Sequence, residues 1–445
     1  MITIDEILPL VPNHLAAQRW YDHDGPPEQV EVADSERWLD GDQDLWWVLV
    51  DARAGERSLG RYQLVLGARP AGEEHPFLHG KSGELLGIVE TDGGPVTVYD
   101  AFIDPPLALE VLRRIAPSVE ASSVRALAVE QSNTSIVYDE HVIVKLFRRI
   151  HVGENPDVDA VTRLAEQGFT HVPAQYGILE RAVDDGGPDD GVVQHLAVAR
   201  EFLTGASDGW HLALASLRVV IADHTESAAS GGDFGPDAQR LGAITGELHT
   251  RLAEVYGTFN ADISSWVSHF RAQLDRVREH VPAEEISRRY DRVAEIRSPG
   301  PGLRIHGDLH LGQMLRADSG WYVIDFEGEP ARPLAERLAP SSPLRDVAGM
   351  LRSFHYAAAV VHHERGEDDD SADLVAEWEE RARTRFLEGY LGTPGIHDLL
   401  PDETTTELLL QAFELDKAVY EVAYETAFRP SWVGIPLGAI RRLLA

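Results

Sequence analysis

The segment from Arg304 to Pro330, RIHGDLHLGQMLRADSGWYVIDFEGEP, concentrates carboxylates, imidazoles and an amide between two stretches with the composition of strands. Asp308 lies in a tight loop, Gln313 comes five residues later, and Asp325 closes the strand-like stretch WYVID. Phosphoryl transfer requires a carboxylate that orients the attacking hydroxyl and accepts its proton, together with oxygen ligands for Mg²⁺. These three side chains could supply those oxygens from one loop-and-strand unit.

A lysine interrupts an otherwise apolar strand pattern. The stretch HVIVKLF alternates, so that Ile143, Lys145 and Phe147 share one face of the predicted strand. A lysine that protects a sheet edge is the structural alternative. The preceding stretch EQSNTSIVY reads as a small polar loop whose N–H groups and hydroxyls could contact phosphates. The candidate phosphate contacts are Ser132, Asn133, Thr134 and Ser135.

Two other patterns resemble a zinc site and a phosphate-binding loop, but each lacks a feature that its motif requires. His306 and His310 have the spacing of a helical zinc pair, but Gly307 between them is a poor helix former and the flanking segments read as strands. HGKSG at 79–83 resembles the end of a phosphate-binding P-loop, but His75 stands where the motif requires its first Gly. We therefore expect neither a zinc site nor a P-loop.

The elements that must position these residues divide the chain into two parts. Strand signals dominate before residue 200, at 44–50, 61–67, 135–139, 141–147 and 192–202, with a short helix at 107–116. Helical periodicity dominates after residue 205, at 238–256, 268–281 and 406–427. A β-rich first half and an α-rich second half predict an α+β protein with its site between two lobes.

Composition limits the class of protein. The chain of 445 residues is 43% hydrophobic, 26% charged and free of Cys, which indicates a globular protein without disulfides or thiolate metal sites. The formal net charge of −34 argues against binding to nucleic-acid phosphates. No signal-peptide pattern and no membrane-length apolar run is present, so we expect a cytoplasmic protein without membrane contact. The sequence leaves the oligomeric state open, with a monomer as the default.

The order of a strand lysine, HGDLHLGQ and WYVIDFEG resembles the protein-kinase-like fold in its aminoglycoside-phosphotransferase branch. The resemblance implies that Asp308 is the catalytic base and that Lys145 contacts the α- and β-phosphates of ATP. It also implies that Gln313 and Asp325 bind Mg²⁺, with Glu327 as a further oxygen on the metal side. The branch usually has Asn where this chain has Gln313, whose longer side chain changes the coordination geometry.

The same resemblance implies further nucleotide contacts. The acidic partner of the strand lysine belongs on the first helix after that strand, where Asp159 is the first candidate and Glu166 the second. The stretch LAVAREFL resembles the hinge between the two lobes of a kinase. Its backbone around Glu201 and Leu203 would pair with the adenine ring.

Ten segments in order are similar to actinobacterial maltokinases over essentially the whole chain. They are QRWYD, GRYQLVLG, EQSNTSIVYDEHVIVKLFRRI, NPDVD, EFLTGASDGW, HGDLHLGQMLR, VIDFEGEP, SPLRDVAGMLRSFHYA, ELDKAVYEVAYE and RPSWVGIPL. Kinases of the same lineage phosphorylate glucosamine. The resemblance implies an N-terminal cap at 1–90, a β-rich kinase N-lobe or intermediate subdomain at 91–203, and an α-helical C-lobe with the catalytic loop and acceptor site at 204–445.

We expect the acceptor pocket where the C-terminal helix faces the loop of Asp308. The stretch ELDKAVYEVAYETAFRPSW carries aromatic rings for sugar faces and charged groups for hydroxyls or an amine. An ordinary amphipathic helix with i,i+4 ion pairs is the alternative. The candidate acceptor-binding residues are Asp308, His310, Asp416, Lys417, Tyr420, Glu421, Tyr424, Glu425 and Trp432.

The carboxylates of this helix could hold the ammonium of an amino sugar, and the acidic protein as a whole attracts cations. The sequence therefore favours an ATP- and Mg²⁺-dependent kinase that converts glucosamine to glucosamine 6-phosphate. The alternatives are maltose, giving maltose 1-phosphate, and an aminoglycoside antibiotic. A catalytically inactive binding protein with the kinase fold is the alternative from another class. The joint presence of Lys145, Asp308, Gln313 and Asp325 argues against it.

Overall fold

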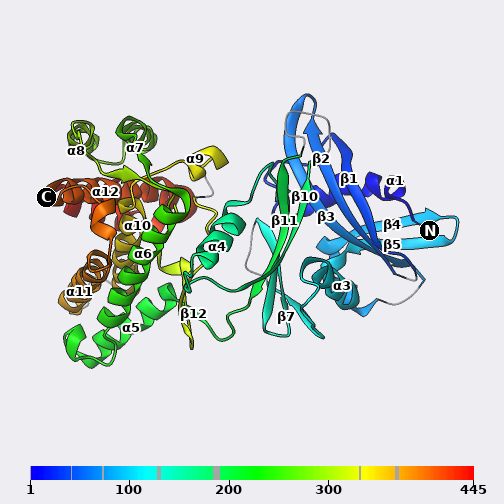
Figure 1. Cartoon of the computed structure of the whole chain (residues 1–445), viewed down its shortest axis with the longest axis horizontal. Helices are drawn as coiled ribbons and strands as arrows, with labels where there is room; N and C mark the ends of the chain where they lie inside the picture. Colours follow the sequence, from blue (N-terminus) through cyan, green and yellow to red (C-terminus); the bar gives the residue numbers. More distant parts are fainter. Residues whose placement is uncertain are drawn as a thin grey trace. The chain divides into compact units, whose positions relative to one another are not determined.

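The computed structural model describes residues 2–41, 43–72, 75–127, 132–183, 191–329, 332–365 and 370–445. The chain divides into two compact units. The first comprises Met1–Asp159 and Pro173–Thr204, and the second comprises Ala160–Val172 and Gly205–Ala445. The first unit is built mainly from strands and the second mainly from helices (Figure 1). Within the described residues, no helix combines the length and apolar composition needed to cross a membrane.

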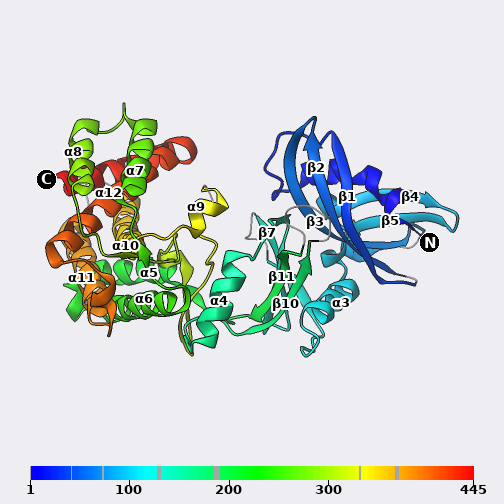
Figure 2. The same ribbon diagram turned by 45° about the horizontal axis from the view of Figure 1, so that its top comes forward.

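The first unit begins with an antiparallel sheet in the order β1-β2-β3-β5-β4, with β9 paired to β3. Its strands are β1 (Gln29–Leu39), β2 (Asp44–Ala54), β3 (Arg57–Pro70), β4 (Leu85–Thr91), β5 (Gly94–Asp100) and β9 (Arg149–Ile150). Alternation along β2 sends Trp47 and Leu49 into one core and Val48 and Val50 into another. The short helices α1 (Ile4–Ile7) and α2 (Val11–Ala17) contribute to the second of these cores (Figure 2).

A second antiparallel sheet of the first unit carries the predicted nucleotide-binding strands. Its order is β10-β11-β8-β7-β6. The strands are β6 (Val124–Ala126), β7 (Asn133–Tyr138), β8 (Val142–Phe147), β10 (Gln175–Ala182) and β11 (Val193–Glu201). Helix α3 (Pro105–Ile115) buries its apolar side in the core under this sheet, and α4 (Pro156–Glu166) follows β9. Strands β10 and β11 pair as a hairpin, and residues 184–190 of its loop lie outside the described residues.

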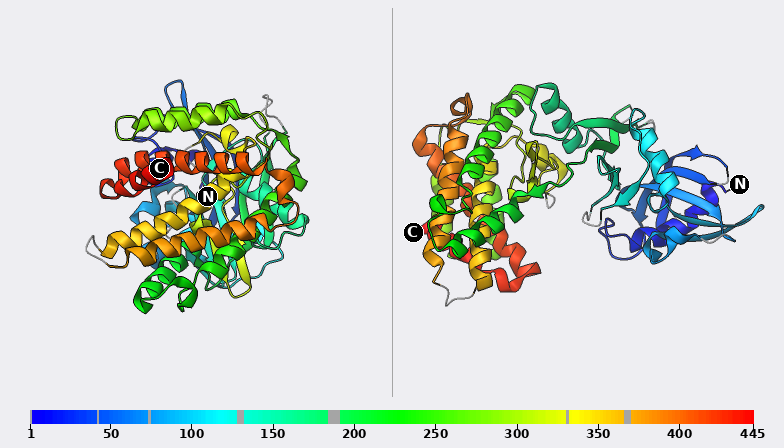
Figure 3. Two further views of the ribbon diagram at one scale, coloured as in Figure 1. Left: turned by 90° about the vertical axis from the view of Figure 1, so that its left-hand side faces the viewer. Right: turned by 90° about the horizontal axis from the view of Figure 1, so that it is seen from below.

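The second unit is a helical bundle around two small sheets (Figure 3). Its helices are α5 (Gly209–Asp223), α6 (Gly235–Tyr256), α7 (Ile263–Val277), α8 (Ala283–Ala294), α9 (Leu334–Leu338), α10 (Leu344–Arg365), α11 (Ala372–Leu391), α12 (Glu403–Phe428) and α13 (Gly434–Leu444). The 3₁₀ turns η5 (Ser227–Ala229), η6 (Leu311–Gln313), η7 (Ile396–Leu399) and η8 (Pro430–Trp432) connect or end them. The sheets pair β12 (Ser207–Asp208), β15 (Met314–Ala317) and β16 (Gly320–Val323), and separately β13 (Phe259–Asn260) and β14 (Pro301–Gly302).

Helices α6 and α11 approach closely because each has a glycine at the crossing. A Cβ added to Gly242 would lie 1.9 Å from the carbonyl oxygen of Phe386. A Cβ added to Gly389 would lie 1.9 Å from the carbonyl oxygen of Gln239. The two backbones therefore leave no room for a side chain, and the crossing fixes the outer wall of the bundle against which α10 packs.

The boundaries differ from the predicted ones in two places. The cap sheet continues through β5 to Asp100, because β4 and β5 form one hairpin that the predicted boundary at residue 90 would divide. The segment Ala160–Val172, predicted in the N-lobe, belongs to the second unit. Its buried Val161, Leu164 and Phe169 join the apolar core of the helical bundle.

Candidate functional site

A buried carboxylate holds the loop that carries Asp308. Asp346, at the start of α10 and 1% exposed, accepts hydrogen bonds from the backbone N–H of His306 at 2.8 Å and of Gly307 at 2.9 Å. His249 on α6 contacts the same carboxylate at 3.2 Å. Gly307 has φ +86°, a left-handed conformation that favours glycine. The charge-assisted hydrogen bonds to Asp346 fix the loop, so that Asp308 is held in one orientation.

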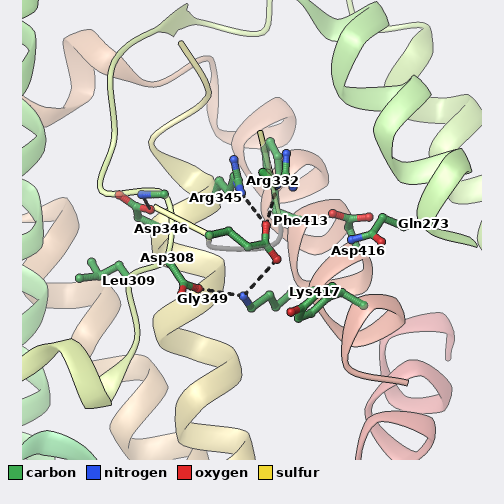
Figure 4. Close-up of a pocket in the computed structure, with 13 residues that line it drawn as sticks. Gln273, Asp308, Leu309, Arg332, Arg345, Asp346, Gly349, Phe413, Asp416 and Lys417 are labelled. Atoms are coloured by element: carbon green, nitrogen blue, oxygen red, sulfur yellow. Dashed lines mark hydrogen bonds and ion pairs between the residues drawn. The ribbon is translucent and has the colours of Figure 1, made fainter. Parts of the chain in front are cut away.

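The carboxylate of Asp308 faces a lysine from α12 (Figure 4). Lys417 on α12 donates a hydrogen bond to Asp308 at 3.2 Å, and its Nζ lies 4.0 Å from Glu329. Glu329 in turn accepts hydrogen bonds from Arg332 at 2.6 Å and from Arg345 at 3.0 Å. A chain of alternating charges therefore runs from the predicted base to two arginines.

The neighbouring charges shift the pKa values of Asp308 and Lys417 and so determine their ionisation. Burial opposes ionisation of Asp308, but Lys417 and His310 lower its pKa to about 2. Burial likewise opposes the charged form of Lys417, but Asp308 and Glu329 raise its pKa above the usual value. Asp308 is therefore a carboxylate at neutral pH, able to accept a hydrogen bond from an acceptor hydroxyl. A base of such low pKa contributes mainly by orienting the hydroxyl, as phosphoryl transfer through a loose transition state requires.

The structure brings together two of the three predicted magnesium ligands. Gln313 ends η6 and Asp325 follows β16, and the Gln313 amide donates to the Asp325 carboxylate at 3.2 Å. Asp325 has φ +67°, an uncommon conformation for a residue other than glycine and one that often occurs at functional sites. Glu327 is half-buried two residues further on. An amide and one or two carboxylates, completed by phosphate oxygens and water, are a donor set that suits Mg²⁺.

The two loop histidines make hydrogen bonds to the backbone. His306 Nε2 contacts the carbonyl oxygen of Ile324 at 2.9 Å, which ties the catalytic loop to the strand before Asp325. His310 Nδ1 accepts from the N–H of Gly312 at 3.0 Å. Among the described residues, no cluster of three or more His, Cys, Asp or Glu side chains could hold a metal ion.

A pocket of about 750 Å³ opens beside Asp308 in the second unit. Its walls come from α5, α10, α12 and the turn η8. Eight of the nine predicted acceptor-binding residues line it: Asp308, His310, Lys417, Tyr420, Glu421, Tyr424, Glu425 and Trp432. Its volume is in the range of small-molecule sites.

Two glutamates of α12 differ in how they are neutralised. Glu421 forms an ion pair with the buried Arg352 of α10. Glu425 is 1% exposed, and its Oε1 accepts from the hydroxyl of Tyr356 and from Arg429 at 2.7 Å. Its Oε2 has no hydrogen-bond partner among the described residues. A buried carboxylate oxygen that lacks a donor is costly unless a ligand supplies one.

Asp416 is the exception among the predicted acceptor residues. It does not line this 750 Å³ pocket but, together with Asp308 and Lys417, it lines a smaller adjoining pocket of about 30 Å³. It lies next to Gln273 and faces His269 of α7, whose Nε2 is 3.9 Å from its carboxylate. Successive residues of a helix point about 100° apart, so Asp416 and Lys417 reach different sides of α12. Burial raises the pKa of Asp416 to about 7, against the opposing effect of Arg332 and Arg345.

Sequence reasoning missed several residues of this site. Those that hold the base and its lysine are Glu329, Arg332, Arg345 and Asp346, and those that shape the acceptor pocket are Asp208, Trp210, His211, Arg352, Tyr356 and Arg429. The segments VIDFEGEP and SPLRDVAGMLRSFHYA, which contain five of them, stood out only as family segments. Charged residues at the start of an apolar stretch, as in RDVAGMLR, are the available signal.

The predicted phosphate contacts lie on adjacent strands of the first unit. Lys145 on β8 is paired in register with Ser135 on β7 and with Val198 on β11. Thr134 Oγ accepts from Arg148 at 2.7 Å, whereas the buried Ser135 hydroxyl has no partner among the described residues. Residues 130 and 131 of the predicted loop lie outside the described residues.

Ser132 and Asn133, at the N-terminal end of β7, are polar and more exposed than Ser135. Asn133 Nδ2 donates to the hydroxyl of Ser132 at 3.2 Å. Ser132 is exposed and Asn133 is half-buried. These two side chains therefore offer polar groups at the end of β7, the position at which we predict phosphate contacts.

The remaining nucleotide candidates differ in burial. Asp159 is buried in the first turn of α4, whereas Glu166 is exposed at its end, which favours Asp159 as the partner of Lys145. The N–H of Glu201 donates to the carbonyl of Ala174 at 2.7 Å. The N–H of Leu203 makes no backbone hydrogen bond with another described residue, which leaves a donor for an adenine ring.

Comparison with known proteins identifies the class. Residues 14–104 match the maltokinase N-terminal cap domain. The glucosamine kinase of Streptacidiphilus jiangxiensis is 30% identical over 350 residues, which cover 74% of this chain and 76% of that protein. The glucosamine kinase of Mycolicibacterium smegmatis is 29% identical over 346 residues, covering 74% of this chain and 81% of that protein. A solved glucosamine kinase in complex with glucosamine, ADP and inorganic phosphate matches all of both chains, with a TM-score of 0.74 at 23% identity.

These matches confirm the predicted α+β, protein-kinase-like fold extended by an N-terminal cap. They also confirm the class of enzyme, a phosphotransferase with an alcohol group as acceptor. The chain belongs to the glucosamine kinase family of actinobacteria, as the resemblance to the maltokinase and glucosamine kinase lineage predicted.

Proposed function

We propose that this protein transfers the γ-phosphoryl group of ATP to the 6-hydroxyl of glucosamine, with Mg²⁺ between the nucleotide phosphates. The observation that carries the choice of acceptor is the buried Oε2 of Glu425, which lacks a donor and belongs to a residue lining the pocket beside Asp308. An ammonium group would supply that donor. The names of both curated relatives support the same acceptor.

The charge of the acceptor pocket supports a cationic substrate. Six carboxylates line it, those of Asp208, Asp308, Glu329, Glu364, Glu421 and Glu425. Three cationic side chains, Arg352, Lys417 and Arg429, line it as well, and arginines outside the pocket pair with Glu329 and Glu364. The pocket therefore offers several carboxylates to a cationic substrate, and the net charge of −34 of the whole chain attracts cations.

The geometry of the sugar ring supports the 6-hydroxyl as the nucleophile. Along α12, Glu421 and Glu425 lie about one and two turns from Lys417, or about 6 and 12 Å of helix rise. In a pyranose, C2 and C5 lie opposite each other across the ring. An amine on C2 held near these glutamates therefore directs the C6 hydroxyl towards the other end of the pocket, where Asp308 lies.

The nucleotide is proposed to bind through Lys145 and the polar start of β7, with adenine at the backbone of Glu201 and Leu203. Gln313 and Asp325 would hold Mg²⁺, with Glu327 as an outer oxygen. The ion supplies positive charge that offsets the charge developing on the transferred phosphoryl group. The chain's own residues orient the acceptor hydroxyl at Asp308 and keep that carboxylate ionised through Lys417.

Asp325→Asn should abolish the magnesium dependence of ATP affinity. Asn tolerates the positive φ of this position, so the loop is kept while the charge is lost. We expect the Kd for ATP measured with Mg²⁺ to rise by roughly 10- to 100-fold, the loss of one charge-assisted contact, and the Kd without Mg²⁺ to stay unchanged. Calorimetric titration with and without Mg²⁺ measures both. Normal MgATP affinity in the variant would contradict the ligand role.

The acceptor is tested by ADP release with glucosamine, maltose, glucose and a panel of aminoglycosides. We expect the highest kcat/KM for glucosamine and a product phosphorylated at C6. Preference for maltose would favour the second candidate, which the match of residues 14–104 to a maltokinase cap domain supports. Nucleotide binding without ADP release on any acceptor would instead favour a catalytically inactive binding protein.

A further inference from the structure

A second cavity of about 370 Å³ lies on the other side of the charged network, away from the acceptor pocket. Helix α7, the segment 336–341 and α12 form its walls. Trp266, Phe270 and Phe413 give it an aromatic floor, and the exposed Asn260 and Ser265 stand at its rim. The predicted site residues do not explain this cavity, because only Asp416 among them lines it.

One wall of the cavity presents two guanidinium groups. Arg332 and Arg345 share a single carboxylate partner, Glu329. Arg332 also donates to His269, whose pKa burial and Arg332 lower to about 4, so that the imidazole is neutral. No described residue accepts a hydrogen bond from Nη1 of Arg332 or of Arg345. Two cations with one carboxylate and spare donors form a site for an anion.

The cavity also carries negative charge of its own. Asp416 is 8% exposed and its Oδ1 has no hydrogen-bond partner among the described residues. Asp262 and Glu336 line the same cavity. Figure 4 shows Asp416 beside Gln273 and apart from the contact between Asp308 and Lys417. The two arginines and the unpartnered Oδ1 of Asp416 therefore favour a ligand that carries both an anionic group and a hydrogen-bond donor such as an ammonium group.

The cavity is connected to the catalytic base by direct contacts. Glu329 holds Arg332 and Arg345 on one side and lies 4.0 Å from Lys417 on the other. An anion that binds the spare N–H groups of the two arginines offsets their positive charge, so that they attract Glu329 less strongly. Glu329 then attracts Lys417 more strongly, which weakens the 3.2 Å contact of Lys417 with Asp308.

We propose that this second cavity binds an amino-sugar phosphate, with the phosphate on Arg332 and Arg345 and the ammonium at Asp416, and that occupancy lowers turnover. The aromatic floor suits the face of a sugar ring, and the volume suits a single phosphorylated hexosamine. The compound is of the class that the proposed reaction produces. The effect on turnover rests on the proposed kinase activity, whereas the binding does not.

The test separates this cavity from the acceptor pocket. Kinetics at saturating ATP and glucosamine are measured with added glucosamine 6-phosphate, glucose 6-phosphate or inorganic phosphate. We expect glucosamine 6-phosphate to lower kcat by about fivefold or more, with no relief at higher glucosamine concentration. Glucose 6-phosphate and inorganic phosphate, which lack the ammonium, should act weakly. Inhibition that raised only the KM for glucosamine would place the ligand in the acceptor pocket and overturn the proposal.

Two variants on α7 give a matched pair. Ser265→Trp places a large side chain at the rim of the cavity, whereas Ser268→Trp places the same side chain on an exposed position that does not line it. We expect Ser265→Trp to lose the inhibition relative to its own basal rate and Ser268→Trp to keep both the inhibition and the basal activity. Asn260→Trp, from the opposite part of the rim, replaces Ser265→Trp if that variant does not fold. Inhibition retained in the rim variant would contradict the site.

Calorimetric binding of glucosamine 6-phosphate without nucleotide gives a readout that does not depend on activity. We expect glucosamine 6-phosphate to bind the wild-type protein with measurable heat. Ser265→Trp should lose the part of this heat that comes from the second cavity. If the wild-type protein binds glucosamine 6-phosphate and Ser265→Trp does not, but the protein phosphorylates no glucosamine, the proposed function is wrong and the proposed binding at the second cavity is supported. If it phosphorylates glucosamine but shows the same binding in both proteins, the cavity proposal fails alone.

Discussion

Replacing Asp308 with Asn is expected to lower kcat by roughly 10²- to 10⁴-fold while leaving the affinity for MgATP unchanged. The substitution keeps the shape of the side chain and removes the charge that orients the acceptor hydroxyl and receives its proton. None of the residues proposed to hold the nucleotide is altered. Steady-state ADP release and calorimetric titration with MgATP measure the two quantities. Unchanged turnover would show that another group acts on the hydroxyl.

Lys417→Met is the matched comparison for this prediction. In the wild type the pKa of Asp308 is held at about 2, so kcat/KM should be flat from about pH 5 to pH 7. Without Lys417, burial acts on Asp308 with less opposition and its pKa rises. The active form is the carboxylate, so activity of the variant should fall as the pH falls through the raised pKa. A profile in Lys417→Met that stays parallel to the wild type would show that Lys417 does not set the protonation of Asp308.

Local spacing is most informative for residues that one continuous segment positions. Asp308, Gln313 and Asp325 lie within one loop-and-strand unit, so local spacing decides which of them meet, and Gln313 and Asp325 are in hydrogen-bond contact. The alternation of HVIVKLF likewise fixed the faces of β8, in which Val142 and Val144 are buried. The fold class followed from the same kind of pattern, because strand and helix periods differ along the chain.

The residues that were missed act over long sequence distances. Asp346 holds a loop 40 residues before it, and nothing in the spacing of an isolated helix shows which backbone groups its first turn meets. Helix geometry directs Asp416 and Lys417 to different sides of α12, but which side faces the catalytic loop depends on how α7 and α10 pack against this helix. The segment 160–172, predicted in the N-lobe, lies in the second unit, and composition does not show this because its apolar residues fit either core.

Replacing Glu425 with Gln is expected to raise the KM for glucosamine by roughly 10- to 150-fold, the loss of about 1.5–3 kcal/mol for a hydrogen bond to a charged group. Glucose has a hydroxyl where glucosamine has its amine, so its KM should change much less. The contacts of Glu425 with Tyr356 and Arg429 involve Oε1, which Gln retains as its amide oxygen. Steady-state kinetics with both sugars measure the difference between them.

Glu364→Gln supplies the control for this prediction. Glu364 also lines the acceptor pocket, but it is paired with Arg218 at 2.7 Å and its side chain is 49% exposed. Removing its charge changes the total charge of the pocket as much as Glu425→Gln does, so a purely long-range effect would raise the KM for glucosamine equally in both variants. A large effect in Glu425→Gln alone, for glucosamine and not for glucose, places the ammonium at the unpartnered oxygen. An equal rise for both sugars would instead show that Glu425 shapes the pocket and does not select the amine.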